Sequence, residues 1–182
     1  MQHQAVKVRL YPTIEQQTIL AQHFGCSRWW WNYALNMCIE TYKTTGKSLT
    51  QIALNKLLPH LKKQEETQWL SECYSQVLQS TTLNLVTAYK NFFESRAKYP
   101  RFKSKKNRQS IQYPQSVKLV DDFLKFPGRV GTVKAGVTST ARGNYQNRNR
   151  QCYFFGEIRS LCVDRTRRRQ TSCKHRWKSC RN

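Results

Sequence analysis

The chain has 182 residues, enough for one ordinary domain or for a small domain followed by a tail. Lys and Arg number 32 against 10 Asp and Glu, so the net charge is +22 at pH 7. Such a field attracts polyanions and favours nucleic acid over a membrane surface or a ribosome as the partner. Because no apolar run is long enough to span a bilayer and the amino terminus lacks a signal-peptide pattern, we expect a cytoplasmic, nucleoid-associated protein.

The amino-terminal third predicts a strand followed by two helices. Residues 5–11 alternate apolar and basic side chains, which is the period of a half-buried strand. Thr13 is a candidate N-cap for a helix through Phe24, and Gly25 is expected to end that helix. A second helix is expected over residues 27–44. This spacing resembles a helix-turn-helix, although any helical hairpin shares it.

Further along, Thr50 is expected to cap a short helix that stops before Pro59, and residues 71–96 predict the longest helix. Short strands are then expected at residues 110–113, 116–119 and 123–126, with a turn at Asp121 and Asp122. The predicted fold class is therefore α+β. A helical insert over residues 13–97 separates the first strand from the basic loop and strands of residues 98–135.

The segment over residues 98–108, KYPRFKSKKNR, carries six basic residues, two aromatic residues and no acid. Lys and Arg neutralise phosphates, and aromatic rings stack on unpaired bases, so this pattern indicates a nucleic-acid contact. A solvated loop that only aids solubility is the alternative. The predicted phosphate contacts are Arg9, Arg28, Arg101, Lys103, Lys105, Lys106 and Arg108, and the predicted stacking residues are Trp29 and Phe102.

Three consecutive Trp residues, Trp29 to Trp31, follow Arg28 and precede Asn32. Neighbours on a helix point about 100° apart, so the three indoles cannot all face the same side. We expect Trp30 to be a core anchor. For Trp29 and Trp31 the sequence leaves two roles open, a base or sugar contact and an ordinary packing contact.

Metal and catalytic patterns are weak. Cys162, Cys173, His175 and Cys180 offer four soft ligands, but their spacing is irregular and lacks a C-x2-C knuckle, so no metal site is predicted. The adjacent acids at residues 65–66 and 121–122 diverge in a helix or strand, whereas a two-metal nuclease needs converging carboxylates. We therefore predict no catalytic residues and no cofactor.

The basic residues change in type after Ala135. Residues 1–135 contain 14 Lys and 6 Arg, whereas residues 136–182 contain 2 Lys and 10 Arg. A break of this kind is typical of translation out of the original frame, and also of a selected Arg-rich tail. We expect residues 136–182 to form an irregular, out-of-frame tail. A real RNA-binding tail is the alternative.

Two stretches carry a family resemblance. VKVRLYPTIEQQTILAQHFGCSRWWWNYALN resembles the amino-terminal segment of TnpB/OrfB-type insertion-sequence proteins, through residues 9–12, Gln16, Gln17, Gly25, Arg28 and Asn32. The stretch AYKNFFESRAKYPRFKSKKNRQS is similar to a second family motif, through Phe92, Phe93, Pro100, Phe102, Lys103, Lys105, Lys106, Gln109 and Ser110. Together they cover roughly residues 5–135.

The resemblance implies an RNA-guided DNA endonuclease with a wedge-like β-barrel, a helical recognition insert and a RuvC-like nuclease domain. Only the first two parts have counterparts here, so an incomplete barrel is expected. Residues 143–150, GNYQNRNR, can be encoded by a nucleotide sequence that gives a different peptide when it is read in a neighbouring frame. That second peptide resembles the next strand of the family's barrel.

The resulting prediction is a truncated transposon-encoded protein that binds structured RNA or transposon DNA without cutting it. One alternative is a complete transposase or nuclease whose site the sequence does not reveal, which three converging acids would favour. Another is a non-enzymatic repressor of transposition, which retained RNA affinity would favour.

Overall fold

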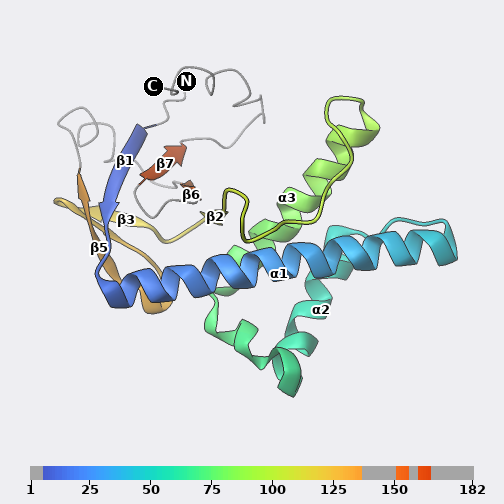
Figure 1. Cartoon of the computed structure of the whole chain (residues 1–182), viewed down its shortest axis with the longest axis horizontal. Coiled ribbons are helices and arrows are strands. Elements are labelled where there is room, and N and C mark those ends of the chain that lie inside the picture. Colours follow the sequence, from blue (N-terminus) through green and yellow to red (C-terminus); the bar gives the residue numbers. More distant parts are fainter. Residues whose placement is uncertain (1–5, 137–150, 156–159, 165–182) are drawn as a thin grey trace.

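The computed structural model describes residues 6–136, 151–155 and 160–164. Strand β1, Val6–Tyr11, leads directly into helix α1, Ile14–Thr45 (Figure 1). Thr13 caps this helix through a reciprocal capping box with Gln16, as its predicted N-cap role requires. Gly46, in the left-handed conformation, ends it.

The predicted helix end at Gly25 is wrong, because α1 runs through this residue without a break. A glycine within a helix costs only about 1 kcal/mol. On either side of it the same helix buries large side chains, among them Phe24 and Trp30. Burying one such side chain contributes roughly 1.5–3 kcal/mol, which outweighs the glycine cost. Packing on both sides of Gly25 therefore joins the two predicted helices into one continuous helix.

Three helical elements follow: α2 at Gln51–Lys63, the 3-10 helix η1 at Glu65–Glu72, and α3 at Ser75–Phe93. The Thr50 cap is confirmed, but α2 continues through Pro59 instead of ending before it. Leu54, Leu58 and Leu61 are all buried, so one apolar stripe spans the proline and offsets its lost hydrogen bond. Helix α3 is shorter than the helix predicted over residues 71–96. Helix α1, and not α3, is the longest of the described helices.

The strands form one antiparallel sheet in the order β2-β6-β7-β1-β5-β4-β3. Strand β2 at Ser110–Tyr113 has the predicted bounds, and β3 at Lys118–Val120 and β4 at Phe123–Lys125 lie within two residues of prediction. The short 3-10 helix η2, Gly128–Val130, precedes β5 at Thr132–Gly136, which had no separate sequence prediction. With β2 and β3 at its two ends, the sheet is open, and the fold class is α+β as predicted.

Strands β6 at Gln151–Phe155 and β7 at Ser160–Asp164 correct the prediction of a wholly irregular tail. Both lie after Ala135, where β7 pairs with β1 and β6 pairs with β2. Free strand edges offer unpaired N–H and C=O groups, and Tyr, Phe, Leu and Val within these segments favour strands. The other residues after Gly136 lie outside the described ranges, as does most of the predicted tail.

The core lies where α1 packs on α3 and the sheet, and where α2 packs on α3 and η1. Trp30 is fully buried and its indole N–H donates to Thr82 of α3 at 2.9 Å, which confirms it as a core anchor. Leu20 and Phe24 are buried as predicted, whereas Ile14 and Tyr42 are exposed because they lie near the ends of α1, beyond the packed elements. No helix in the described ranges is long and apolar enough to cross a membrane.

Candidate nucleic-acid interface

The basic loop, residues 98–108, joins α3 to β2 and runs back beside α1 (Figure 1). Two consecutive α1 residues hold its backbone. The Trp31 indole N–H donates to the Arg101 carbonyl at 3.0 Å. The Asn32 amide donates to the Lys103 carbonyl at 3.0 Å and accepts from the Lys103 N–H at 2.7 Å. The loop is therefore anchored to α1 through its main chain.

A third anchor lies at the end of the basic loop. Arg28 of α1 donates to the Gln109 side-chain carbonyl at 2.9 Å. The Gln109 amide in turn donates to the carbonyls of Ser104 at 2.8 Å and Asn107 at 2.6 Å. Without Gln109 these carbonyls would have to accept hydrogen bonds from water, because the loop forms no strand or helix that would pair them. Arg28 and Gln109 thus fold the turn at residues 104–107 and fasten it to α1.

Five basic residues of the loop are exposed: Lys98 and the four predicted phosphate contacts Arg101, Lys105, Lys106 and Arg108. Phe102, next to Arg101, is 55% exposed, an unusual position for a large apolar ring. The structure therefore brings five of the predicted site residues together on one anchored loop. Its surface offers what a polyanion with unpaired bases needs, namely closely spaced cations and a ring face.

The remaining predicted residues are placed differently. Arg9 lies exposed on β1, with its guanidinium 5.8 Å from the centre of the Tyr11 ring, and takes no part in anchoring the loop. Trp29 is partly buried, stacked on Tyr33 at 5.0 Å between ring centres and edge-on to Trp69 of η1 at 5.3 Å. For Trp29 and for Trp31, whose indole holds the loop, packing contacts account for the positions seen.

Lys103 is the one predicted cation of the basic loop that turns inward. Its ammonium lies 3.9 Å from the centre of the Trp31 ring, a cation–π contact. Burial lowers the pKa of Lys103 to about 8, because the charged form loses water. No carboxylate within the described ranges restores that loss. Among the described residues, Lys103 is therefore a partly desolvated cation without a carboxylate partner.

Sequence reasoning missed the anchoring roles of Asn32 and Gln109. Both residues were quoted as carriers of the family resemblance, but neither was given a function. The signal available was their polarity: Asn32 lies within a row of aromatic residues, and Gln109 follows a run of cations. Neither position alone shows what the side chain contacts, since the partners lie 71 and 81 residues apart in the chain.

Within the described ranges, no group of three or more His, Cys, Asp or Glu residues is arranged to hold a metal ion. Cys173, His175 and Cys180 lie outside those ranges, as does the side chain of Cys162. The described part of the structure thus contains an anchored basic surface and no arrangement of residues suited to a metal centre.

Residues 1–47 match the family model described as a helix-turn-helix domain found in OrfB proteins of IS605-type elements. Two similar proteins share the name "Putative RNA-guided DNA endonuclease". The one from Streptomyces pristinaespiralis is 41% identical over 62% of this chain, and InsQ from Escherichia coli is 37% identical over 64%. The virulence protein VsdF from Salmonella dublin is 33% identical over 56% of this chain and 92% of its own length.

This chain belongs to the TnpB/OrfB-type family of insertion-sequence proteins. It spans only 28% and 29% of the two endonuclease-named relatives. The helix-turn-helix family match covers β1 and α1, which here form a strand and one uninterrupted helix. The two motifs that first suggested the TnpB/OrfB family meet in space, because Arg28 and Asn32 of one motif bind Gln109 and Lys103 of the other.

Proposed function

We propose that this chain is a nucleic-acid-binding unit of the TnpB/OrfB type, which contacts structured RNA or transposon DNA through the basic loop. The observation that carries the proposal is the main-chain anchoring of that loop on α1. A loop fixed in this way presents its cations without first losing backbone freedom, and ordering each free residue would cost about 1–2 kcal/mol.

Arg101, Lys105, Lys106 and Arg108 are the proposed phosphate contacts, and Phe102 is the proposed stacking residue. Each phosphate neutralised releases condensed counterions, so these contacts contribute both affinity and its salt dependence. Arg9, Arg28 and Trp29 stay predictions of secondary contacts, because Arg9 lies on the sheet and the other two already have protein partners. With no described membrane-spanning helix, we place this activity at the nucleic acid of the cytoplasm.

The salt dependence of binding tests the proposal. The full chain and the triple variant Arg101→Ala, Lys105→Ala, Lys106→Ala are titrated against a fluorescein-labelled RNA hairpin and a matched DNA duplex. Removing three phosphate contacts should reduce the slope of log affinity against log salt by about 2 for unpaired strands and about 3 for duplex. The preferred form of nucleic acid is the one that the wild-type chain binds more tightly at the same salt concentration.

The control is a triple variant with the same charge loss elsewhere, Lys43→Ala, Lys47→Ala, Lys56→Ala, on the far end of α1, the turn after it and α2. All three of these lysines are exposed. If the two triple variants reduce the slope equally, general charge and not the anchored loop is responsible, and the basic-loop proposal fails.

We further infer that the chain binds without cleaving. Its ten acids are sparse, and the described ranges hold no cluster suited to a metal ion. Incubating the purified chain with DNA and Mg²⁺, with and without RNA, should leave the DNA intact. Cleavage that disappears when one of its own acids is changed to Ala would refute this.

Two finer points of architecture are also proposals. We infer that the open sheet is part of a wedge-like barrel, supported by β1 pairing on both sides at its centre. We also propose that residues 1–135 are the binding unit and that residues 136–182 arose by a shift of frame, supported by the change from Lys to Arg. The encoding DNA tests the second point, because a family-like frame should lie one base out of register after Ala135.

A further inference from the structure

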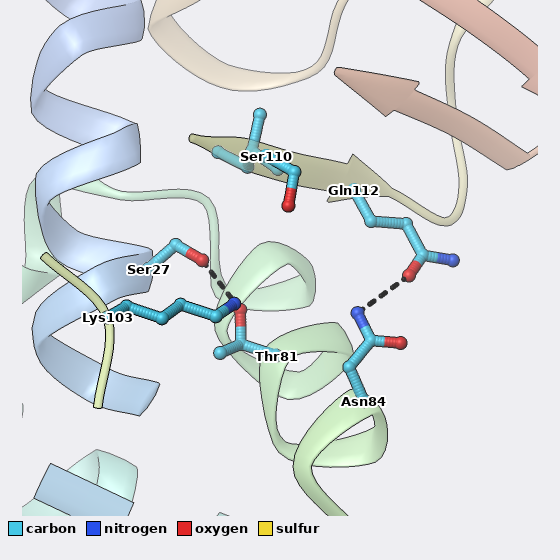
Figure 2. A pocket seen from close by; sticks show the side chains of 7 residues that line it. Ser27, Thr81, Asn84, Lys103, Ser110 and Gln112 are labelled. Atoms are coloured by element: carbon cyan, nitrogen blue, oxygen red, sulfur yellow. Dashed lines mark hydrogen bonds between the residues drawn. The ribbon is translucent and has the colours of Figure 1, made fainter. Parts of the chain in front are cut away.

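Behind the basic loop lies a small polar pocket between α1, α3 and β2 (Figure 2). Its volume is about 50 Å³, several times the roughly 10–15 Å³ that a single water needs. The lining residues are Ser27, Thr81, Asn84, Lys103, Ser110, Ile111 and Gln112. Six of the seven are polar, which is unusual for a space enclosed by packed helices and a strand.

The hydrogen bonds on the floor of the pocket set its polarity. Thr81 donates to the Val77 carbonyl at 3.0 Å, so the hydrogen of the 2.8 Å contact between Ser27 and Thr81 comes from Ser27. Both hydroxyl groups have therefore used their hydrogens and turn lone pairs toward the pocket. Oxygen lone pairs attract an ammonium without neutralising it, so a floor of this polarity suits the Lys103 ammonium and leaves its charge in force.

The outer wall supplies donors instead. Ser110 is exposed and its hydroxyl points into the pocket, on the side facing Thr81 and the Lys103 ammonium (Figure 2). Asn84, also exposed, donates one amide hydrogen to Gln112 at 3.2 Å and keeps a second. An anion entering from this side would meet the exposed hydroxyl and amide first and the more buried ammonium beyond them.

Deepening the proposed function and resting on it, we propose that this pocket is a phosphate-binding site, which takes one backbone phosphate of the bound nucleic acid between Lys103 and Ser110. The ligand chemistry follows from the missing counter-charge, because no described carboxylate pairs with this partly buried ammonium. The source follows from the neighbouring residues, since Arg101 and Lys105, two positions before and after Lys103 in the chain, are both exposed and attract a polyanion to this loop. Burial lowers the pKa of Lys103, and the negative charge of a bound phosphate raises that pKa again by stabilising the ammonium.

The test uses the full chain and three single variants: Lys103→Met, Ser110→Ala and, as a matched loss of one exposed charge, Lys56→Met. Affinity is measured with the labelled RNA hairpin and DNA duplex, and thermal stability is measured on the same samples. Lys103→Met should weaken binding about tenfold and Ser110→Ala about threefold, as expected for a charged and a neutral hydrogen bond. Lys56→Met should change affinity less than about twofold.

Thermal stability distinguishes a phosphate-binding role of Lys103 from a purely structural role. Met keeps much of the Lys103 stem on Trp31 and removes a desolvated charge, so Lys103→Met should hold or raise the melting temperature while affinity falls. A melting temperature that falls with unchanged affinity would show a packing role and overturn the proposal. Unchanged affinity in Lys103→Met, with weakened binding in the basic-loop triple variant, would reject the pocket and leave the proposed function standing.

A second arm identifies the source of the phosphate. Inorganic phosphate is added at constant ionic strength, and the gain in melting temperature is compared between the wild-type chain and Lys103→Met. If Lys103→Met binds RNA or DNA more weakly than the wild-type chain does, the result supports a phosphate of the nucleic acid as the ligand. Stabilisation by inorganic phosphate that depends on Lys103, without any effect of Lys103→Met on nucleic-acid affinity, would overturn that assignment in favour of free phosphate.

Discussion

Asn32 shows how one side chain fixes a loop that has no regular structure. Its amide reaches both the N–H and the carbonyl of Lys103, as a neighbouring strand would. A primary amide holds its donor and its acceptor side by side in one plane, as a peptide group does, which suits Asn32 to this pairing. Because Asn32 lies on a packed helix, its position is set by the core and passed on to the loop.

We predict that Asn32→Ala releases the basic loop from α1. The Lys103 N–H and carbonyl lose their partner, which should lower the free energy of unfolding by about 1–3 kcal/mol. The Lys103 amide should also exchange with solvent much faster than in the wild-type chain, which hydrogen-exchange NMR can measure.

The control for this prediction is Asn36→Ala, one turn further along α1. Asn36 is exposed and its amide bonds only to Glu40, at 2.8 Å. Both variants gain the same helix propensity from Ala, so their difference isolates the loop contact. Equal stability of the two variants would contradict an anchoring role for Asn32.

At the scale of elements, α1 carries most of the organisation. Its 32 residues extend about 48 Å at the usual rise per residue, far enough to contact the sheet, α3 and the basic loop in turn. Its amino-terminal end touches the sheet, where Gln16 donates to the Thr132 carbonyl at 2.7 Å. Its middle holds the basic loop. A break at Gly25 would separate these two functions.

Gly25→Ala tests whether α1 is continuous. A Cβ at this position meets no atom within 4 Å, and the backbone there is helical. We expect the variant to be more stable by about 0.5–1 kcal/mol, measured by denaturant unfolding, because Ala loses less backbone entropy than Gly.

Gly46→Ala provides the contrasting case at the end of the same helix. Gly46 has φ +67°, which a residue with a Cβ adopts at a cost, so this variant should lose about 1 kcal/mol. Destabilisation by Gly25→Ala as well would indicate a left-handed turn at Gly25 and a helix-turn-helix break in place of the continuous helix.

For the whole molecule, the sheet draws its strands from widely separated parts of the chain. Strand β1 pairs with β5 over Arg9–Tyr11 and with β7 over Val6–Val8. Neither partner is near β1 in sequence, and β7 lies in the Arg-rich segment whose composition suggested translation out of the original frame. Backbone pairing depends little on where a sequence came from, because every residue except proline supplies an N–H and a carbonyl.

Cys162→Pro tests whether β7 is part of the folded sheet. Cys162 is opposite Lys7 of β1 and Tyr153 of β6, so proline removes a ladder hydrogen bond from an interior strand. We expect a fall of several degrees in melting temperature, from a loss of roughly 3 kcal/mol. Cys162→Ser keeps the N–H and is the matched control. Identical melting temperatures for the two variants would remove β7 from the stable fold.

Sequence alone determined the features set by local chemistry. The alternation in residues 5–11, the Thr13 and Thr50 caps, the bounds of β2 and the concentration of cations in the basic loop all follow from neighbours in the chain. The family resemblance was equally available, since it rests on residue types at fixed spacing. Burial of Trp30, Val77 and Leu85 followed from helical periodicity.

Tertiary structure decided what depended on distant partners. Gly25 and Pro59 are local signals to stop a helix, and burial on both sides of each overrode them because packing free energy exceeds backbone propensity. The inward turn of Lys103, unlike its neighbours Arg101 and Lys105, follows from the Trp31 face and the pocket beyond it. Anchoring by Asn32 and Arg28 likewise required the loop to return to α1, and no property of either residue's own neighbours encodes that meeting.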